Sequence, residues 1–445
     1  MNIRSKRRLA ALSRRGRRCL TTIGLYALLA LSVSLAVPLA AGAAGSGSGP
    51  SAGDGVEVEL VHWWISPGES AALDVIREEV ARRGGIWKEI AVDSYLDTKT
   101  VVSKRLQLDL PPTLTQWISG DDLMALHEIK RLGPMPQEWR GQPLRELIFD
   151  ELFEMVQKDG VALAIPVGVH MQNYALHNAK AYAAIGAGPP AHWRDFLDLA
   201  PKLAAAGYVP IATSGEDRQI ENLFMTIGID LGGIDLYYDI YGDGPVDIGN
   251  AKVLGEAFTL LRELRGHALE PRLRRGWAEV TRMVADGEAA TMIMGDFAKG
   301  DMVAAGLEPG RDFLCSFAPG NQGIQLWAAD VFVPLNPSQD DPDPGVEFVM
   351  DIILDPAVQA EFARRKGALP VRKGIDPELM GPCERDIYVG WEAGKNRLVP
   401  LVGVADSIRA ATIRTLIKDY WDNPVLTPEE AATNFIETIN DAIMR

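Results

Sequence analysis

The sequence predicts an α/β protein, because short β-branched segments alternate with amphipathic helical segments along the chain. The first strand is expected at residues 56–62 and the first helix at about 69–81, and the loop between them begins with Trp63-Trp64. The same order recurs with a strand at 86–92 and a helix near 98–110. Further strands are expected at 161–166, 209–213, 289–294 and 326–334. A layered arrangement of sheets and helices follows from this order.

Several helices carry recognisable end signals. One follows His192 and closes at Gly207, and another is expected at about residues 344–354. The last helix is expected at about 428–444, where Thr427 is a suitable N-cap and a proline occupies the favoured first position. No repeat of fixed period interrupts this pattern.

The composition is that of a globular chain of two or three domains. Of its 445 residues, 47% are hydrophobic and 24% are charged. Sixty acidic residues against 45 basic ones argue against a groove that neutralises nucleic-acid phosphates. Three cysteines without a CxxC pair give neither a disulfide scaffold nor a thiolate metal site, and no cofactor is expected.

The N-terminus has the pattern of a secretory signal peptide. Its first 18 residues hold eight basic side chains and no acid, and an apolar run from Ile23 to Pro38 follows. Small residues then lead to an expected cleavage after Ala43. A permanent membrane anchor is the alternative, but the apolar run is shorter than the roughly 20 residues that a span needs. The Arg14-Arg15 pair leaves the twin-arginine export route open.

Cleavage of the leader changes the charge balance of the chain. The eight basic residues leave with it, so the formal net charge falls from −15 to −23. Residues 44–55 are rich in Gly and Ser and are expected to form a flexible linker. Cys315 and Cys383 remain in an oxidising compartment, where a disulfide and two buried thiols are both open interpretations.

The common catalytic motifs are absent. The sequence lacks a GxSxG elbow, a GxxxxGK[ST] phosphate loop, an HExxH zinc helix and a GxGxxG turn placed after a strand. Hydrolase, nucleotidase and dehydrogenase functions therefore lose their usual signatures. His170 follows a strand-like segment, so it is either a group that faces a cleft or a buried structural histidine.

The most unusual local feature is Trp63-Trp64 at the carboxyl end of the first strand, where ligands gather in open α/β sheets. Adjacent indoles point in different directions, so one is expected to pack and the other to face a cleft. An exposed indole suits stacking against the C–H face of a pyranose ring. The short turn that follows brings Glu69 beside it, and a carboxylate that accepts sugar hydroxyls complements such a ring.

Further candidate groups lie at later strand exits. Trp277 begins a helix that leads into a strand and then into Asp296-Phe297. Asp330 lies within an apolar strand, and Lys366 ends a helix. Each has a structural alternative, since Phe297 could be core, Asp330 could cap a turn and Lys366 could only complement a helix dipole.

With these residues the sequence resembles the periplasmic sugar-binding proteins of ATP-driven (ABC) importers, extracellular solute-binding protein family 1, and in particular their glucose/mannose-binding branch. The resemblance covers essentially the whole mature chain. Its best matches are HWW-x4-E at His62–Glu69, PP-x3-Q-x3-G at Pro111–Gly120, P-x3-H-x2-N at Pro166–Asn173, MGDFAKGD at Met294–Asp301 and DPAVQAEFARRKGALPVR at Asp355–Arg372.

The resemblance implies a two-lobe periplasmic binding protein fold of type II, with a hinge that the chain crosses three times. The crossings are expected near Val167–Val169, Gly320–Gln325 and Val371–Lys373. Residues 56–168 plus 326–371 would form the N-terminal lobe, and residues 169–325 plus 372–445 the C-terminal lobe.

The resemblance also implies the ligand-binding groups. Trp64 with Trp63, and Trp277, would be ring-stacking platforms, and Phe297 stands where relatives usually have Trp. Four residues would bind hydroxyls, namely Glu69, Gln116, Asp330 and Lys366. Asp296 and His170 complete the predicted set.

The sequence also departs from these relatives. It has Ile118 where they tend to have His, Asn173–His177 where they tend to have a Trp-rich stretch, and Asp217-Arg218 where they tend to have an aromatic residue. The identity of the sugar therefore does not follow from the resemblance.

The expected function is that of an exported, monomeric binding protein without catalysis. It would capture a mono- or small oligosaccharide by hinge closure and present it to inner-membrane ABC permease subunits. One alternative is a secreted glycoside hydrolase, in which Glu69 and Asp330 would be the paired carboxyls. Another is the same binding fold serving a periplasmic sensor.

Overall fold

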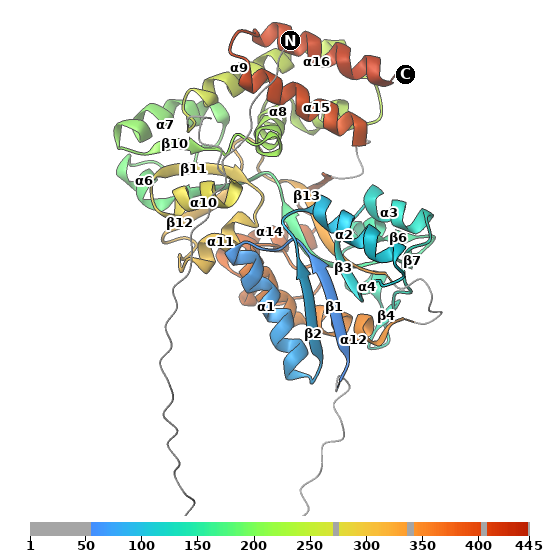
Figure 1. Ribbon diagram of the computed structural model, residues 1–445. Helices are drawn as coiled ribbons and strands as arrows, with labels where there is room; N and C mark the ends of the chain where they lie inside the picture. Colours follow the sequence, from blue (N-terminus) through green and yellow to red (C-terminus); the bar gives the residue numbers. More distant parts are fainter. Residues whose placement is uncertain (1–54, 270–275, 336–341, 402–406, 444–445) are drawn as a thin grey trace, which may run out of the picture. The chain divides into compact units, whose positions relative to one another are not determined.

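A computed structural model gives the structure of the protein and describes residues 55–269, 276–335, 342–401 and 407–443. The predicted leader, residues 1–43, lies outside the described residues, as does nearly all of the predicted linker. Strands and helices alternate along much of the described chain, which confirms the α/β class (Figure 1). No helix in the described part of the chain combines the length and the apolar character that crossing a bilayer requires.

A six-stranded sheet organises the first part of the fold. Its order is β14-β13-β3-β1-β2, and β8 also pairs with β13. The pairs of β1 with β2 and with β3 are parallel, whereas β13 runs antiparallel to β3 and β8. Its strands are β1 (Glu57–His62), β2 (Ile86–Ala91), β3 (Leu114–Ile118), β8 (Ile165–Met171), β13 (Ile324–Pro334) and β14 (Arg397–Pro400).

Helices and short hairpins pack around this sheet and share one apolar core with it. The helices are α1 (Pro67–Arg82), α2 (Tyr95–Gln107), α3 (Asp121–Glu128), α4 (Leu144–Leu147), α5 (Asp150–Val156), α12 (Pro344–Ile353) and α13 (Pro356–Lys366). The hairpins are β4 (Glu138–Trp139) with β5 (Gln142–Pro143), and β6 (Gln157–Lys158) with β7 (Val161–Ala162).

A separate four-stranded sheet has the order β10-β11-β9-β12. Its strands are β9 (Tyr174–Asn178), β10 (Val209–Ala212), β11 (Ala289–Met294) and β12 (Phe313–Phe317). Its flanking helices are α6 (Ala179–Ala184), α7 (Trp193–Ala205), α10 (Trp277–Ala285) and α11 (Ala298–Ala304).

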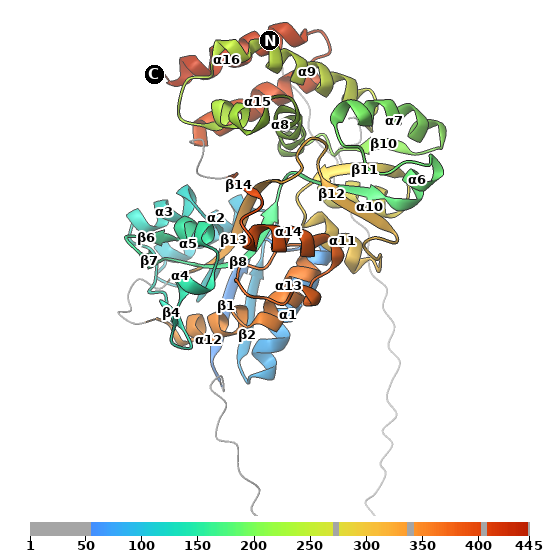
Figure 2. The ribbon, with the colours of Figure 1, turned by 180° about the vertical axis from the view of Figure 1, so that it is seen from behind.

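A second large apolar core lies among long helices that Figures 1 and 2 show side by side. These helices are α8 (Asp217–Tyr241), α9 (Ala251–Arg265), α15 (Ser407–Asp422) and α16 (Pro428–Ile443). The remaining elements are α14 (Pro382–Glu392) and the 3-10 turns η1 (Ile248–Asn250) and η2 (Pro377–Leu379).

The chain passes between the two sheets after β8 and again after β12. β8 continues to Met171 because its last residues still pair with β13, so the first change of sheet follows Met171. The second falls between Phe317 and Ile324. Beyond α13, Leu369 bridges Val169 and Arg372 bridges Ile148. The predicted hinge positions and lobe boundaries remain predictions.

Most of the predicted elements lie within a few residues of the observed ones. The second helix begins at Tyr95, earlier than the predicted Thr98, because the Ser94 hydroxyl accepts the amide of Asp97 at 3.2 Å and caps it. The strand predicted at 161–166 was wrong as one element, since its first two residues pair with β6 in a hairpin and only its last two begin β8. Thr427 accepts the amide of Glu430 at 3.2 Å, so the predicted N-cap of the last helix is confirmed.

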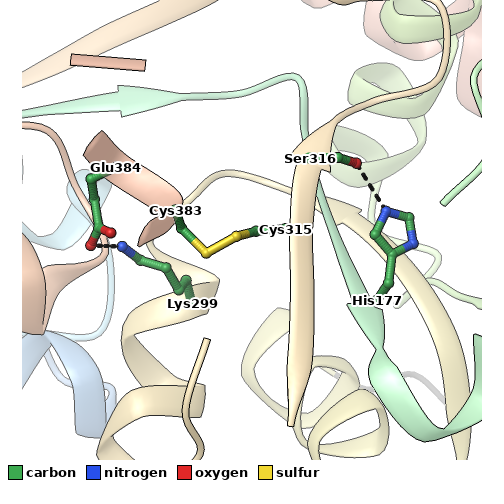
Figure 3. Close-up of a disulfide and its surroundings, with 6 residues drawn as sticks. All are labelled: His177, Lys299, Cys315, Ser316, Cys383 and Glu384. Atoms are coloured by element: carbon green, nitrogen blue, oxygen red, sulfur yellow. Dashed lines mark hydrogen bonds and ion pairs between the residues drawn. A yellow bond between two sulfur atoms is a disulfide. The ribbon is translucent and has the colours of Figure 1, made fainter. Parts of the chain in front are cut away.

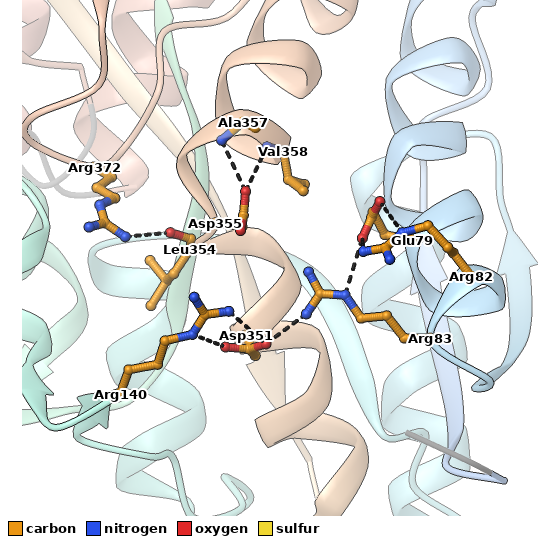
Figure 4. Close-up of polar contacts among 10 residues, drawn as sticks. All are labelled: Glu79, Arg82, Arg83, Arg140, Asp351, Leu354, Asp355, Ala357, Val358 and Arg372. Carbon is orange, nitrogen blue, oxygen red and sulfur yellow. Dashed lines mark hydrogen bonds and ion pairs between the residues drawn. The ribbon is translucent and has the colours of Figure 1, made fainter. Parts of the chain in front are cut away.

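Arginines join the end of α1 and the turn between β4 and β5 to α12 (Figure 4). The Asp351 carboxylate accepts Arg83 at 2.6 Å and Arg140 at 3.0 Å. Arg140 and Arg372 both lie 4.4 Å from the ring centre of Trp139. Asp351 thus offsets the repulsion between the two arginines that it bonds, Arg83 and Arg140.

Cys315 and Cys383 form a disulfide, which resolves the alternative that the sequence left open. The bond joins β12 to the first turn of α14 (Figure 3). Lys299 of α11 and Glu384 of α14 form an ion pair beside it, with both side chains almost completely buried. We call the disulfide and this ion pair the anchored contact.

Candidate functional site

The first segment of the site is the connection from β1 to α1. Ser66 is the N-cap of α1, and Pro67 occupies its first turn, where a missing N–H costs nothing. The Ser66 hydroxyl accepts the Glu69 amide at 3.3 Å, and Glu69 Oε2 accepts the Ser66 amide at 3.2 Å. This capping box fixes Glu69 a short distance from Trp64, as the sequence predicts.

The second segment is the connection from β11 to α11, which carries Asp296 and Phe297. It is tied to the end of β8 by a pair of hydrogen bonds to Met171. The Met171 amide donates to Asp296 Oδ2 at 3.0 Å, and the Asp296 amide donates to the Met171 carbonyl at 3.0 Å. Asp296 is therefore held where the chain passes from one sheet to the other.

His170 lies between two carboxylates that are far apart in sequence. Its Nδ1 is 2.8 Å from Asp296 Oδ1, and its Nε2 is 3.2 Å from Asp330 Oδ2. Only an imidazolium can donate from both ring nitrogens, so this geometry favours the charged ring. Burial and Lys366 act to lower the pKa of His170, but the two carboxylates outweigh them and that pKa is raised.

Trp64 connects this charged group to the first segment. Its ring packs against Phe332 and Phe362, with ring centres 5.6 Å apart in each pair. Its Nε1 donates to Asp330 Oδ2 at 3.2 Å, and only 2% of the residue is exposed. Burial acts to raise the pKa of Asp330, yet the hydrogen bonds and charges around it, His170 foremost, leave that pKa lowered.

Lys366 closes the network from the end of α13. Gly367 ends this helix in the left-handed conformation, with a φ of 85°, which favours glycine. The buried Lys366 ammonium lies 3.3 Å from Glu69 Oε1. It also lies 5.4 Å from the ring centres of both Trp64 and Phe297, within the range of a cation–π interaction.

The rings of His170, Phe297 and Trp277 pack together beside Lys366. Phe297 lies edge to face with Trp277 at 5.0 Å and with His170 at 5.6 Å between ring centres. Trp277 begins α10 and is only partly buried. It is therefore the member of this aromatic group that offers a partly exposed surface.

The structure joins eight of the ten predicted site residues through direct contacts, and we call these eight the charged network. Its members are Trp64, Glu69, His170, Trp277, Asp296, Phe297, Asp330 and Lys366.

The two other predicted residues lie beside this network and contact each other. The Trp63 amide donates to Gln116 Oε1 at 3.0 Å, and the Trp63 ring packs edge to face on Tyr95 at 5.2 Å. Gln116 is fully buried, and its Nε2 is without a hydrogen-bond partner among the described residues.

Sequence reasoning did not select Ser66 or Asp301, although both lie in quoted motifs. Asp301 Oδ1 accepts the Ser66 hydroxyl and the Gly68 amide, each at 2.8 Å. The serine–proline–glycine–glutamate order of a capping box is the one signal that could have selected Ser66. Nothing local marks Asp301 as its partner, because 235 residues separate the two.

Comparison with known proteins places the chain in a family. The family model of bacterial extracellular solute-binding proteins matches residues 84–382. A "Probable sugar-binding periplasmic protein" of Brucella melitensis is 29% identical over 398 residues, which are 88% of this chain and 94% of the relative. A protein of the same description from Rhizobium meliloti is 29% identical over 392 residues, 86% of this chain and 94% of the relative.

Solved structures agree on the fold. The bacterial solute receptor AcbH, described with a preference for β-D-galactopyranose, is 17% identical and has a TM-score of 0.72, over 88% of this chain and 100% of its own. RafE in complex with raffinose is 14% identical with a TM-score of 0.68, over 88% and 100%. The chain therefore belongs to the bacterial extracellular solute-binding proteins and has the two-lobe periplasmic binding protein fold of type II.

Proposed function

We propose that the protein binds a mono- or small oligosaccharide between its two lobes and delivers it to the permease of an ABC importer. The observation that carries this proposal is the charged network, to which segments on both sides of the chain crossings contribute. Trp64 and Asp330 come from the six-stranded sheet, whereas Trp277 and Phe297 flank the four-stranded sheet. A ligand that contacts both sets favours the arrangement in which they meet.

The network combines the two kinds of group that sugar recognition needs. Carboxylates and an ammonium ion bind hydroxyls through charge-assisted hydrogen bonds, which fix the orientation of a ring. Aromatic faces cover its C–H surface and exclude water. Gln116 lies beside the network, and its buried Nε2 has no hydrogen-bond partner among the described residues. The similarity to relatives described as sugar-binding supports the same ligand class.

The state of the carboxylates supports binding rather than hydrolysis. A glycosidase needs one carboxyl with a raised pKa as its general acid, beside a second carboxylate. Glu69 instead pairs with Lys366 and with the Ser66 amide, and the pKa of Asp330 is lowered. A lowered pKa makes Asp330 unsuited to the role of general acid.

Export to the periplasm follows from the N-terminal pattern and agrees with the periplasmic relatives. We propose a signal peptide cleaved near Ala43 and a monomeric mature protein that meets inner-membrane permease subunits. Delivery to a periplasmic sensor would use the same site and differs only in the partner.

The mature protein, residues 44–445, should be titrated with a panel of neutral mono- and oligosaccharides while tryptophan fluorescence and melting temperature are followed. A sugar that binds only the folded protein must raise its melting temperature. Replacement of Trp277 by Ala should weaken the binding of that sugar by about tenfold or more, because it removes a large aromatic contact.

Trp87 provides a matched control, since it lies on β2 and its Nε1 bonds to Glu89, outside the charged network. Trp87→Ala should leave the affinity unchanged. If no sugar in the panel changes the emission or the melting temperature, or if both variants lose affinity equally, the proposal is wrong.

A further inference from the structure

Asp301 is not one of the predicted ligand-binding residues, yet it makes a contact between distant segments of the chain. It lies in α11, and its Oδ1 accepts both the Ser66 hydroxyl and the Gly68 amide, each at 2.8 Å. The first amides of an α-helix have no partner within the helix, and the positive end of the helix dipole favours an anion there. Asp301 therefore caps α1 from a different segment of the chain.

Glycines let the two backbones approach one another at this point. A Cβ on Gly68 would lie 2.4 Å from the carbonyl carbon of Gly300 and 2.5 Å from the Asp301 nitrogen. A Cβ on Gly300 would lie 2.6 Å from the Lys366 carbonyl oxygen. Such distances exclude any side chain at positions 68 and 300 while α1, α11 and α13 keep this packing.

The contact joins segments on opposite sides of the chain crossings. α1 precedes the first change of sheet after Met171, whereas α11 lies between that change and the second one after Phe317. We call Ser66 and Gly68 with Gly300 and Asp301 the closing contact, because it must break when the two lobes separate.

We propose that the closing contact itself holds the lobes together, with Asp301 as a positioning residue that fixes the segment between Trp64 and Glu69. The inference rests on the proposed function for its effect on affinity. Every group in the contact is a protein atom, so the contact favours the closed form whether or not sugar is bound. Affinity then scales with the fraction of the protein that the contact keeps closed.

Gly68→Ala tests this directly. Alanine suits an α-helix better than glycine, so α1 itself should not be weakened, yet the added methyl group prevents α11 from approaching. Gly255→Ala is the matched control, because Gly255 lies within α9 and an added Cβ there meets nothing within 4 Å. Both variants should keep the melting temperature of the sugar-free protein. Only Gly68→Ala should shift the sugar-free protein toward the form in which the two lobes are apart.

Two measurements on the sugar-free protein report the closing contact. Small-angle X-ray scattering should give a larger radius of gyration for Gly68→Ala than for wild type and Gly255→Ala. Hydrogen exchange at the backbone amide of residue 68 should be slow in wild type, where Asp301 accepts this proton, and at least about tenfold faster in Asp301→Ala. An ordinary first-turn amide would exchange rapidly in both proteins.

The affinity for a sugar that the titration panel identifies should fall by about tenfold in Gly68→Ala and by about threefold to tenfold in Asp301→Ala. An unchanged radius of gyration, or rapid exchange at position 68 in wild type, would overturn the inference. Both readouts need no sugar, so they remain decisive if the proposed function fails. Equal loss of affinity in Gly255→Ala would also contradict it.

Discussion

Helix α11 makes two contacts of opposite character within three residues. Lys299 forms the buried ion pair with Glu384, next to the disulfide that fixes α14 to β12. Asp301 faces α1 and makes the closing contact, which consists of hydrogen bonds and glycine backbones. The first contact buries two opposite charges, whereas the second joins a partly buried carboxylate to the first turn of another helix. One short helix thus carries both the buried ion pair and the contact that we propose to close the lobes.

The largest effect is expected from breaking the buried ion pair on one side. Glu384→Gln leaves the Lys299 ammonium buried without its partner, and burial already lowers the pKa of this lysine. The free energy of unfolding should fall by about 3 to 5 kcal/mol. Urea denaturation of the sugar-free protein measures this change.

Two variants show whether the buried charge is the cause. The double variant Lys299→Met with Glu384→Met should recover most of the loss, because no charge remains buried. Glu57→Gln, which breaks the half-exposed pair with Lys88, should cost less than about 1 kcal/mol. A double variant less stable than Glu384→Gln would mean that shape, not charge, governs this position.

The disulfide should have the next largest effect, and it should act on stability rather than on affinity. The bond joins residues 68 positions apart, so its removal in Cys315→Ala with Cys383→Ala should lower the unfolding free energy by about 2 to 4 kcal/mol. Sugar affinity should stay within about threefold of wild type, because the closing contact does not involve these residues.

Reduction with dithiothreitol provides the control for this prediction. It should destabilise the wild type by a similar amount and leave the double cysteine variant unchanged. A loss of affinity without a loss of stability would show that the disulfide takes part in closing the lobes. The prediction that the disulfide side of α11 acts only on stability would then be wrong.

Local patterns in the sequence predict the α/β class, most strands and the helix caps, since these depend on neighbouring residues. They also place Glu69 near Trp64, because the intervening turn is short. They do not predict that His170 bonds to Asp296 and Asp330, which are 126 and 160 residues away. Those contacts depend on the register of β8 against β13 and on the connection after β11, which tertiary packing decides.

The burial of Trp64 has the same origin. An indole at a strand exit has the pattern of an exposed ring, yet Phe332 and Phe362 cover it from β13 and α13. Residues 268 and 298 positions later supply these rings, so no local rule anticipates them. The disulfide is similar, because compartment and cysteine count allow it while only the packing of α14 on β12 brings the two residues together.

Two buried histidines give the last and smallest effect, with opposite signs on the two sides of the fold. His177 lies on β9 beside the anchored contact, and its Nε2 bonds to Ser316 Oγ at 3.0 Å (Figure 3). Burial lowers the pKa of His177 to about 3, from an ordinary value of 6.5. Its contribution to stability is present above the ordinary pKa and is lost as the pH falls toward the lowered one.

His170 behaves in the opposite way, because its pKa is raised in the folded protein. Its contribution is fully present below a pH of about 6.5 and is lost as the pH rises through the raised pKa.

Unfolding free energies should be measured against pH for wild type, His177→Asn and His170→Gln. His177→Asn should remove about 1 to 2 kcal/mol of the difference in stability between about pH 7 and 5. His170→Gln should instead flatten the decline above about pH 6.5, and it alone should weaken sugar binding, because only His170 belongs to the charged network. Identical pH profiles for the two variants would mean that the carboxylates do not keep His170 charged.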